Sequence, residues 1–277
     1  MLAARRPERH RRGRIRRLTL IVVLAVCCAK PVEAPHRINR IVTLAPNITE
    51  MTFSAGCGAK VVATDNFSDY PEAVKRLPRV GGVEPDVERI AALHPDLAIA
   101  SSSNAHPNLR RALEAAHVPL LVIRTDRLSQ IAPAMERIQH DAGCSSALTV
   151  SAALERQRRA RAKSPSVMFA VWTNPLYVAG DATYFDDLLK LAGARNAVTA
   201  SGWPQYSLEA FAAHPPDLLL VPNRSVTAGA VADLLRRAHV RVETVTVDED
   251  VFARPGPRVV QAAAELNRIL DQWEKSH

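Results

Sequence analysis

One stretch of fourteen residues occurs twice in this chain. Residues 87–100 read VERIAALHPDLAIA and residues 208–221 read LEAFAAHPPDLLLV, with six identical positions at an offset of 121 residues. Further along, Ala-His-Val at 116–118 recurs at 238–240. Each copy predicts a short helix, a Pro-Asp turn and an apolar strand. Solenoid units repeat every ~20–50 residues, so this longer offset indicates a duplicated lobe.

Strands and helices are expected to alternate around both copies. Apolar, β-branched runs predict strands at 40–45, 61–64, 97–100 and 120–123, and again at 167–172, 218–221 and 242–247. Helices are expected at 49–56, from 87, at 108–116, 131–140, 184–191, from 208, at 230–238 and at 258–273. Such alternation is typical of an α/β fold with parallel sheets covered on both faces. Two lobes of this kind predict a cleft between them, which is a favoured place for a ligand.

The segment between the two lobes has a different composition. Residues 145–163 contain no Gly or Pro and are rich in helix-forming residues, and Pro165 follows them. We interpret the segment as one long connecting helix of about 28 Å. The alternative is an ordinary surface helix of a single larger domain. The predicted organisation is a first lobe at 36–141, a connecting helix at 142–164 and a second lobe at 165–277.

The net charge of +8 is concentrated at the start of the chain. Residues 1–34 have a net charge of +7, whereas the remainder holds 27 basic and 26 acidic residues. A nearly neutral body lacks the basic surface that nucleic acid requires, so a nucleic-acid partner is excluded.

The basic head precedes an apolar run at 18–29 that is too short to span a bilayer. This pattern predicts a secretory signal peptide over residues 1–34, with cleavage after Ala34. An uncleaved membrane anchor is the alternative. Residues 24–27 (LAVC) also form a weak lipidation motif ending at Cys27. In each case the body of the protein lies on the exported side of the membrane.

Two cysteines, Cys57 and Cys144, remain outside this leader. In an oxidising compartment they either pair, closing a long loop, or remain two buried thiols. The sequence leaves both alternatives open.

Six segments in order carry a resemblance to a known family. They are RIVTLAPNITE, FSDYP, VERIAALHPDL, PLYVAGDATYFDDLLKLAGARNAV, WPQYSLEAF and DVFARPGPRVV. Together they resemble the cobalamin-binding periplasmic proteins of ABC importers, within the group that binds haem, siderophores and corrinoids. The resemblance implies two Rossmann-like lobes joined by one long helix. It also implies a monomer in the periplasm that delivers a corrinoid to an inner-membrane permease.

The ligand site is expected where strands end, because open α/β sheets bind ligands there. Aromatic faces suit a wide apolar disc, and polar side chains suit its fringe of amides. The expected ligand-binding residues are Asn47, Phe67, Tyr70, Trp172, Tyr177, Trp203, Asp250, Val251, Phe252, Ala253 and Arg254. The alternative for Phe67, Tyr70 and Trp203 is packing at the edge of a lobe, and for Asp250 and Arg254 it is a surface ion pair.

The sequence departs from the family at four positions. Two pocket tryptophans have no counterpart, since Gly82 and Ser101 occupy their positions, and Ala192 and Asn267 occupy the positions of a second-lobe disulfide. The missing tryptophans concern the ligand pocket rather than the fold. Haem or an iron-siderophore is the alternative ligand, and Tyr70, Tyr177 or Tyr206 would then ligate iron. A tetrapyrrole-handling protein without a transport role is a further alternative.

Glu88 and Glu209 occupy equivalent positions in the two copies of the repeat. The resemblance implies that each docks one lobe on the permease. Each lies two residues after a predicted N-cap, Asp86 or Ser207. A carboxylate at that position favours the helix by about 0.3–1 kcal/mol, which is the structural alternative.

No catalytic or metal site is expected. The histidines lack zinc-site spacing, and Gly56-x-Gly58 follows a helix rather than a strand, so it is no dinucleotide motif. A phosphate-binding loop and a nucleophile elbow are also missing. We therefore predict a binding protein without enzymatic activity and without a cofactor.

Overall fold

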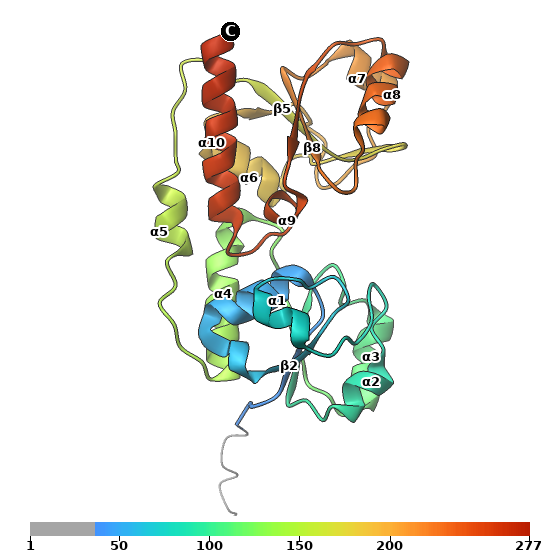
Figure 1. The fold of residues 1–277 in the computed structure, drawn as a ribbon, viewed down its shortest axis with the longest axis vertical. Coiled ribbons are helices and arrows are strands. Elements are labelled where there is room, and N and C mark those ends of the chain that lie inside the picture. The colour runs from blue at the N-terminus through green and yellow to red at the C-terminus, as the bar shows by residue number, and fades with distance from the viewer. Residues whose placement is uncertain (1–36) are drawn as a thin grey trace, which may run out of the picture. The chain divides into compact units, whose positions relative to one another are not determined.

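Two separate β-sheets organise residues 37–277, the part of the chain described by this computed structural model (Figure 1). The first sheet has the order β2-β1-β3-β4, and all its neighbouring strands are parallel. The second has the order β6-β5-β8-β9, with β7 also on β5, and only β6 is antiparallel. The strands are β1 (Ile41–Thr43), β2 (Val61–Thr64), β3 (Leu97–Ser101), β4 (Leu120–Ile123), β5 (Ser166–Thr173), β6 (Leu176–Val178), β7 (Arg195–Asn196), β8 (Leu218–Pro222) and β9 (Glu243–Val247). The predicted α/β fold with a parallel sheet in each of two lobes is confirmed.

Helices follow most strands, as the alternating pattern predicts. The α-helices are α1 (Pro46–Thr52), α2 (Val87–Ala92), α3 (Pro107–Ala115), α4 (Ile131–Ala142), α5 (Val150–Glu155), α6 (Tyr184–Leu191), α7 (Leu208–Ala213), α8 (Ala228–Ala238), α9 (Glu249–Phe252) and α10 (Val259–Ser276). Short turns of other helix types are η1 (Phe53–Cys57), η2 (Gly58–Lys60), η3 (Glu72–Arg76) and η4 (Leu128–Gln130). The short helix α9, which comes shortly after β9, was not predicted. The hairpin of β5 and β6 was not predicted.

The predicted leader, residues 1–34 with Cys27, lies outside the described residues. Among residues 37–277, no helix combines the length and the apolar character that a membrane crossing requires.

The repeated stretches form the same structure twice, α2-β3-α3-β4 and α7-β8-α8-β9. Asp96 Oδ2 accepts hydrogen bonds from the backbone N–H groups of Asn39 and Arg40, just before β1, at 2.7 and 2.9 Å. Asp217 Oδ2 likewise accepts one from the N–H of Ser166, the first residue of β5, at 2.7 Å. The repeated aspartate therefore ties two neighbouring strands together at their starts in both lobes.

The second repeated motif, Ala-His-Val, ends a helix in both lobes. His117 and His239 have φ angles of 54° and 55°, in the left-handed region. His239 follows α8 directly, and His117 follows α3 after one intervening residue. A left-handed residue is a common way to stop a helix. The following valines, Val118 and Val240, pack into the hydrophobic core of each lobe.

Alternation along the strands divides the core into three clusters. Val42 and Ala98 face a cluster that belongs to the first lobe, and Met168 faces one that belongs to the second. Ile41, Ile99, Val167 and Phe169 face instead a single cluster shared by both sheets, to which helices α4, α5, α6 and α10 also contribute. Because successive strand residues point to opposite faces, each sheet packs one face on its own helices and the other on this shared core. The two lobes are thus joined by buried apolar surface.

The prediction of one long connecting helix over 145–163 is wrong. Only the six residues of α5 are helical, and they are preceded and followed by irregular chain. Tertiary hydrogen bonds replace the helical ones, since the N–H of Arg159 donates to the carbonyl of Leu191 at 3.0 Å and the amide of Asn267 donates to the carbonyl of Gln157 at 2.7 Å. The basic residues of this segment would also repel one another at helical spacing. Helix propensity was therefore overridden by contacts with α6 and α10.

Arg161, in this connecting segment, is almost completely buried, with 3% of its side chain exposed. Its Nε donates to the carbonyl of Ala192 at 2.8 Å, and its Nη2 donates to the carbonyl and side-chain oxygens of Asn267 at 3.2 and 3.1 Å. Its Nη1 contacts Asp271 at 2.6 Å. Ala192 and Asn267 are the two positions at which the family resemblance places a disulfide. Here a guanidinium links them.

The first lobe does contain a disulfide. Cys57, at the end of η1, is bonded to Cys144, just after α4, with 5.5 Å between their Cα atoms. Of the two alternatives that the sequence left open, the structure has the paired one.

Candidate functional site

A cavity of about 720 Å³ lies where strands of both sheets end. Residues that follow β1, β2, β3 and β4 line it from the first sheet, and residues that follow β8 and β9 line it from the second. This is the position at which open α/β sheets bind ligands. The lining residues are Ala45, Pro46, Asn47, Asn66, Phe67, Asp69, Ser101, Ser103, Asn104, Thr125, Asp126, Tyr184, Trp203, Arg224, Glu249, Asp250, Ala253, Arg254 and Pro255.

Six of the eleven residues predicted to bind a ligand line this cavity. They are Asn47, Phe67, Trp203, Asp250, Ala253 and Arg254. They come from both sheets, so the structure brings together residues that are up to about two hundred positions apart in sequence. Their role in binding a ligand remains a prediction.

The other five predicted residues do not line the cavity. Phe252 is fully buried in the shared core, and Val251 packs against that core. Trp172 and Tyr177 face each other across the β5–β6 hairpin, where the indole N–H of Trp172 donates to the carbonyl of Asn174 at 3.0 Å. The ring of Tyr70 lies under the guanidinium of Arg258, 4.6 Å from its centre. Tyr177 and Tyr206, two of the tyrosines considered for iron, are likewise outside the lining.

Two exposed aromatic rings flank the cavity. Phe67 is 56% exposed, and its ring lies against Gly82, where a Cβ atom would come within 3.1 Å of it. Trp203 is 43% exposed and packs on the ring of Tyr184 at 5.8 Å between centres. The hydroxyl of Tyr184 donates to the carbonyl of Phe252 at 2.7 Å, and burial raises its pKa. Gly82, in place of a family tryptophan, thus makes room for Phe67.

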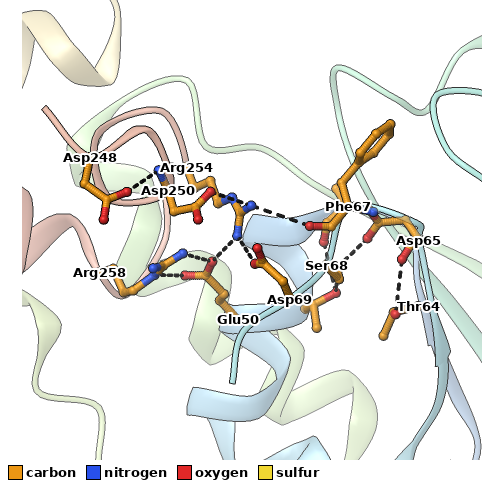
Figure 2. A network of polar contacts seen from close by, with 12 residues as sticks. Glu50, Thr64, Asp65, Phe67, Ser68, Asp69, Asp248, Asp250, Arg254 and Arg258 are labelled. Atoms are coloured by element: carbon orange, nitrogen blue, oxygen red, sulfur yellow. Dashed lines mark hydrogen bonds and ion pairs between the residues drawn. The ribbon is translucent and has the colours of Figure 1, made fainter. Parts of the chain in front are cut away.

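A buried carboxylate, Glu50 on α1, holds two arginines from the second lobe (Figure 2). The guanidinium of Arg258 donates to both its oxygens, at 2.9 and 2.6 Å. Nη1 of Arg254 lies 3.3 Å from the same carboxylate. Bidentate pairs of this kind are strong and fix geometry. Glu50 therefore positions the guanidinium of Arg254 at the cavity wall.

Arg254 also forms ion pairs with two carboxylates of the cavity wall (Figure 2). It contacts Asp69 Oδ1 at 2.6 Å and Asp250 Oδ1 at 2.6 Å. Arg224 contacts Asp250 as well, and its Nη1 is 3.8 Å from Asp69 Oδ2. Because Asp69 belongs to the first lobe and the other three groups to the second, these ion pairs bridge the lobes beside the cavity.

Two aspartates of the loop after β2 have opposite pKa shifts. Burial raises the pKa of Asp65, although hydrogen bonds from Ser68 and from the backbone of Phe67 partly oppose this. Partial burial also acts on Asp69, but the hydrogen bond and charge of Arg254, with the charge of Arg224, outweigh it, and the pKa of Asp69 lies below its ordinary value. Asp65 holds the loop that carries Phe67, whereas Asp69 is ionised at the cavity.

Several lining residues were not identified from the sequence. They include Asn66, Asp69, Ser103, Asn104, Thr125, Asp126, Arg224 and Glu249. Most lie within a few residues of a strand end, as Arg224 does after β8, so position relative to the predicted strands was the available signal. Glu50 had no such signal, because its role depends on arginines more than two hundred residues away.

Glu88 and Glu209, the two predicted docking residues, lie in the first turns of α2 and α7, and both are exposed. Asp86 and Ser207 cap these helices by accepting hydrogen bonds from Arg89 and Ala210, at 2.9 and 3.1 Å. Glu88 and Glu209 occupy equivalent positions in the two lobes because their helices are copies of one repeat.

Residues 37–277 contain no cluster of three or more His, Cys, Asp or Glu side chains that could hold a metal.

Comparisons with known proteins agree with this architecture. Residues 41–271 match the family model described as periplasmic binding protein. A vitamin B12-binding protein of Yersinia pseudotuberculosis is 28% identical over 258 residues, covering 89% of this chain and 90% of its own.

Two solved structures share the fold. The haem-binding protein RhuT of Roseiflexus sp. RS-1, in its apo form, has a TM-score of 0.71 at 24% identity and covers 86% of this chain and 99% of its own. The vitamin B12-binding protein BtuF of Vibrio cholerae has a TM-score of 0.69 at 23% identity and covers 86% of this chain and 98% of its own. These proteins differ in ligand, so the likeness shows the fold alone. Members of the matched family bind small solutes and work with membrane permeases. On the match over residues 41–271, the chain belongs to the periplasmic binding protein family.

Proposed function

We propose that this protein binds cobalamin, or a related corrinoid, in the cavity between its lobes and delivers it to the permease of an ABC importer. The observation that carries the proposal is the chemistry of the cavity wall. Phe67 and Trp203 offer exposed aromatic faces, while amide and hydroxyl groups such as Asn66, Ser103 and Asn104 offer hydrogen-bond partners. A corrin has an apolar plane fringed with amides, which matches both kinds of group.

The alternative ligand, haem, finds less support in the same wall. A protein that ligates haem iron supplies a side chain such as His or Tyr. Tyr184 is the one tyrosine among the residues lining the cavity, its hydroxyl donates to the carbonyl of Phe252, and no histidine occurs in that lining. A corrinoid needs no such ligand from the protein, because its cobalt carries axial groups of its own. The wall therefore favours a corrinoid over a haem held through iron.

Titration of the purified protein with cyanocobalamin and, separately, with haemin tests this function. Tryptophan fluorescence is expected to be quenched by cyanocobalamin at micromolar concentration, because Trp203 lies at the cavity. Quenching by haemin alone would assign the protein to haem, and quenching by neither would remove tetrapyrroles as ligands.

A matched pair of variants locates the binding surface. Trp203→Ala is expected to weaken cyanocobalamin binding by about tenfold, the effect of one well-placed aromatic contact. Trp172→Ala is the control, since Trp172 is similarly exposed but lies on the hairpin outside the cavity lining. Isothermal titration calorimetry measures both. Equal losses for the two variants would contradict binding in this cavity.

Glu88 and Glu209 are proposed to dock the two lobes on the permease. Surface charges of this kind steer association and fix orientation more than they add affinity. The double variant Glu88→Lys, Glu209→Lys should abolish ligand uptake into vesicles containing the permease, with ligand affinity unchanged. The exposed Glu136 on α4 provides a control as Glu136→Lys. Undiminished uptake by the double variant would remove the docking role.

A further inference from the structure

The charges of the cavity wall do not balance. Four lining residues are carboxylates, Asp69, Asp126, Glu249 and Asp250, whereas two are arginines, Arg224 and Arg254. Below them, Glu50 and Arg258 form a bidentate pair. An incoming ligand therefore meets two more negative charges than positive ones.

The pairing of these groups identifies the two surplus charges. Asp69 and Asp250 are both in direct contact with Arg254, and Arg224 contacts Asp250 and approaches Asp69. Two carboxylates and two arginines thus neutralise each other beside the cavity. This leaves Asp126 and Glu249 as the unbalanced charges.

Asp126 follows β4 and belongs to the first lobe. Its side chain is 62% exposed, and its ion-pair contact is a long one, 3.8 Å from the Nε of Arg124, which does not line the cavity. An arginine at that distance, with both side chains largely exposed to solvent, screens a charge only weakly. The carboxylate of Asp126 is therefore available to groups in the cavity.

Glu249 begins α9 in the second lobe. Its Oε2 accepts hydrogen bonds from the backbone N–H and the hydroxyl of Ser225, at 2.7 Å for the N–H. Within residues 37–277, no basic side chain lies at ion-pair distance from it. Neutral donors hold the carboxylate in place without cancelling its charge. The two surplus charges thus come from opposite lobes.

We propose that Asp126 and Glu249 act as a charge filter that determines specificity, so that the cavity accepts corrinoids without net negative charge and disfavours anionic tetrapyrroles. This inference rests on the proposed function. The two unbalanced carboxylates can accept hydrogen bonds from the amide N–H groups of a corrinoid, and they attract the positive charge centred on its cobalt. The propionates of haem would instead meet like charges, and opposed charges of the same sign penalise the wrong partner.

Three probes of different charge test the filter. Aquacyanocobinamide is cationic and lacks the nucleotide-loop phosphate, cyanocobalamin is neutral overall, and haemin carries two propionates. Affinities are measured by calorimetry for the wild type, Asp126→Asn, Glu249→Gln and the double variant, with Glu136→Gln as a control on an exposed carboxylate of α4. Each measurement is repeated at low and at high salt.

Each single neutralisation should tighten haemin binding and weaken cobinamide binding by up to about fivefold, the effect of one exposed charge pair. Cyanocobalamin affinity should stay within about twofold, and all effects should shrink at high salt because such charges are screened. The filter would be overturned if the variants changed the affinities for all three probes by the same factor and in the same direction. It would also be overturned if no variant changed any affinity.

The outcomes also separate the filter from the proposed function. If the wild type binds cyanocobalamin but the variants change the affinities of the three probes without regard to probe charge, the proposed function stands and the filter is refuted. Failure of the wild type to bind either corrinoid would refute the function, and the haemin series would then decide the filter alone. Because Asp126 is exposed, Asp126→Asn is expected to fold normally and keeps the test interpretable if Glu249→Gln does not.

Discussion

The two lobes are fastened to the connecting segment by different chemistry. At its start, Cys144 is bonded to Cys57 of the first lobe. At its end, Arg161 is buried against α6 and α10 of the second lobe, where it donates to the carbonyls of Ala192 and Asn267. The repeated stretches themselves are alike down to the aspartate that joins neighbouring strands. The duplication thus supplies a common scaffold, whereas the fastenings and the cavity wall are specific to each lobe.

The spacing of the two lobes does not depend on a connecting helix. The segment between the lobes is mostly irregular, so it cannot act as a rigid rod. Its two ends are instead fixed to the lobes, and the lobes share a hydrophobic core to which Val150 and Leu154 of α5 contribute. Lobe spacing is therefore determined by packing and cross-links.

Removing the disulfide is expected to have the largest effect. The double variant Cys57→Ser, Cys144→Ser should lower the free energy of unfolding by about 2–4 kcal/mol, because the bond closes a loop with a sequence separation of 87 residues and so restricts the unfolded chain. Urea unfolding of wild type and variant measures it. A reducing agent should destabilise the wild type alone, and a response of the variant to the reducing agent would contradict this explanation.

Removing the second fastening should cost somewhat less. Arg161→Ala leaves the carbonyls of Ala192 and Asn267 without their donor, at an expected cost of about 2–3 kcal/mol by chemical denaturation. Arg158→Ala is the matched control, because Arg158 lies in the same segment but is exposed and paired with Glu155. If both variants lost the same stability, Arg161 would not be the fastening residue.

The ion pair between Asp69 and Arg254 gives the smallest effect, visible in its pH dependence. Because the pKa of Asp69 is lowered in the folded protein, its contribution to stability is present above the ordinary pKa of 3.8 and is lost as the pH falls through the folded value. The stability difference between wild type and Asp69→Asn should therefore be largest near neutral pH and vanish once the pH is below the lowered pKa of Asp69 in the folded protein. A difference that persists unchanged at low pH would show that Asp69 acts through something other than its charge.

Much of the architecture could be predicted from local patterns. The repeat, the alternation of strands and helices and the caps at Asp86 and Ser207 each depend on residues close together in sequence, and the structure has them where they were expected. The position of the cavity also followed, because parallel strands in two lobes present their carboxyl ends to ligands. Phe67, Trp203 and Arg254 were found among its lining by that reasoning together with the family resemblance.

What the sequence by itself determined, then, is the duplicated α/β scaffold, since periodicity and turn residues act over a few positions. Only the tertiary structure decided that residues 145–163 are largely irregular and that Arg161 links Ala192 to Asn267. It also decided that Trp172 and Tyr177 lie outside the cavity lining. The contact between Glu50 and Arg254 likewise came only from the tertiary structure. The physical reason is the same in each case. These features depend on hydrogen bonds, charges and burial between residues distant in the chain, and such contacts outweigh local preferences that are worth only a few tenths of a kcal/mol per residue.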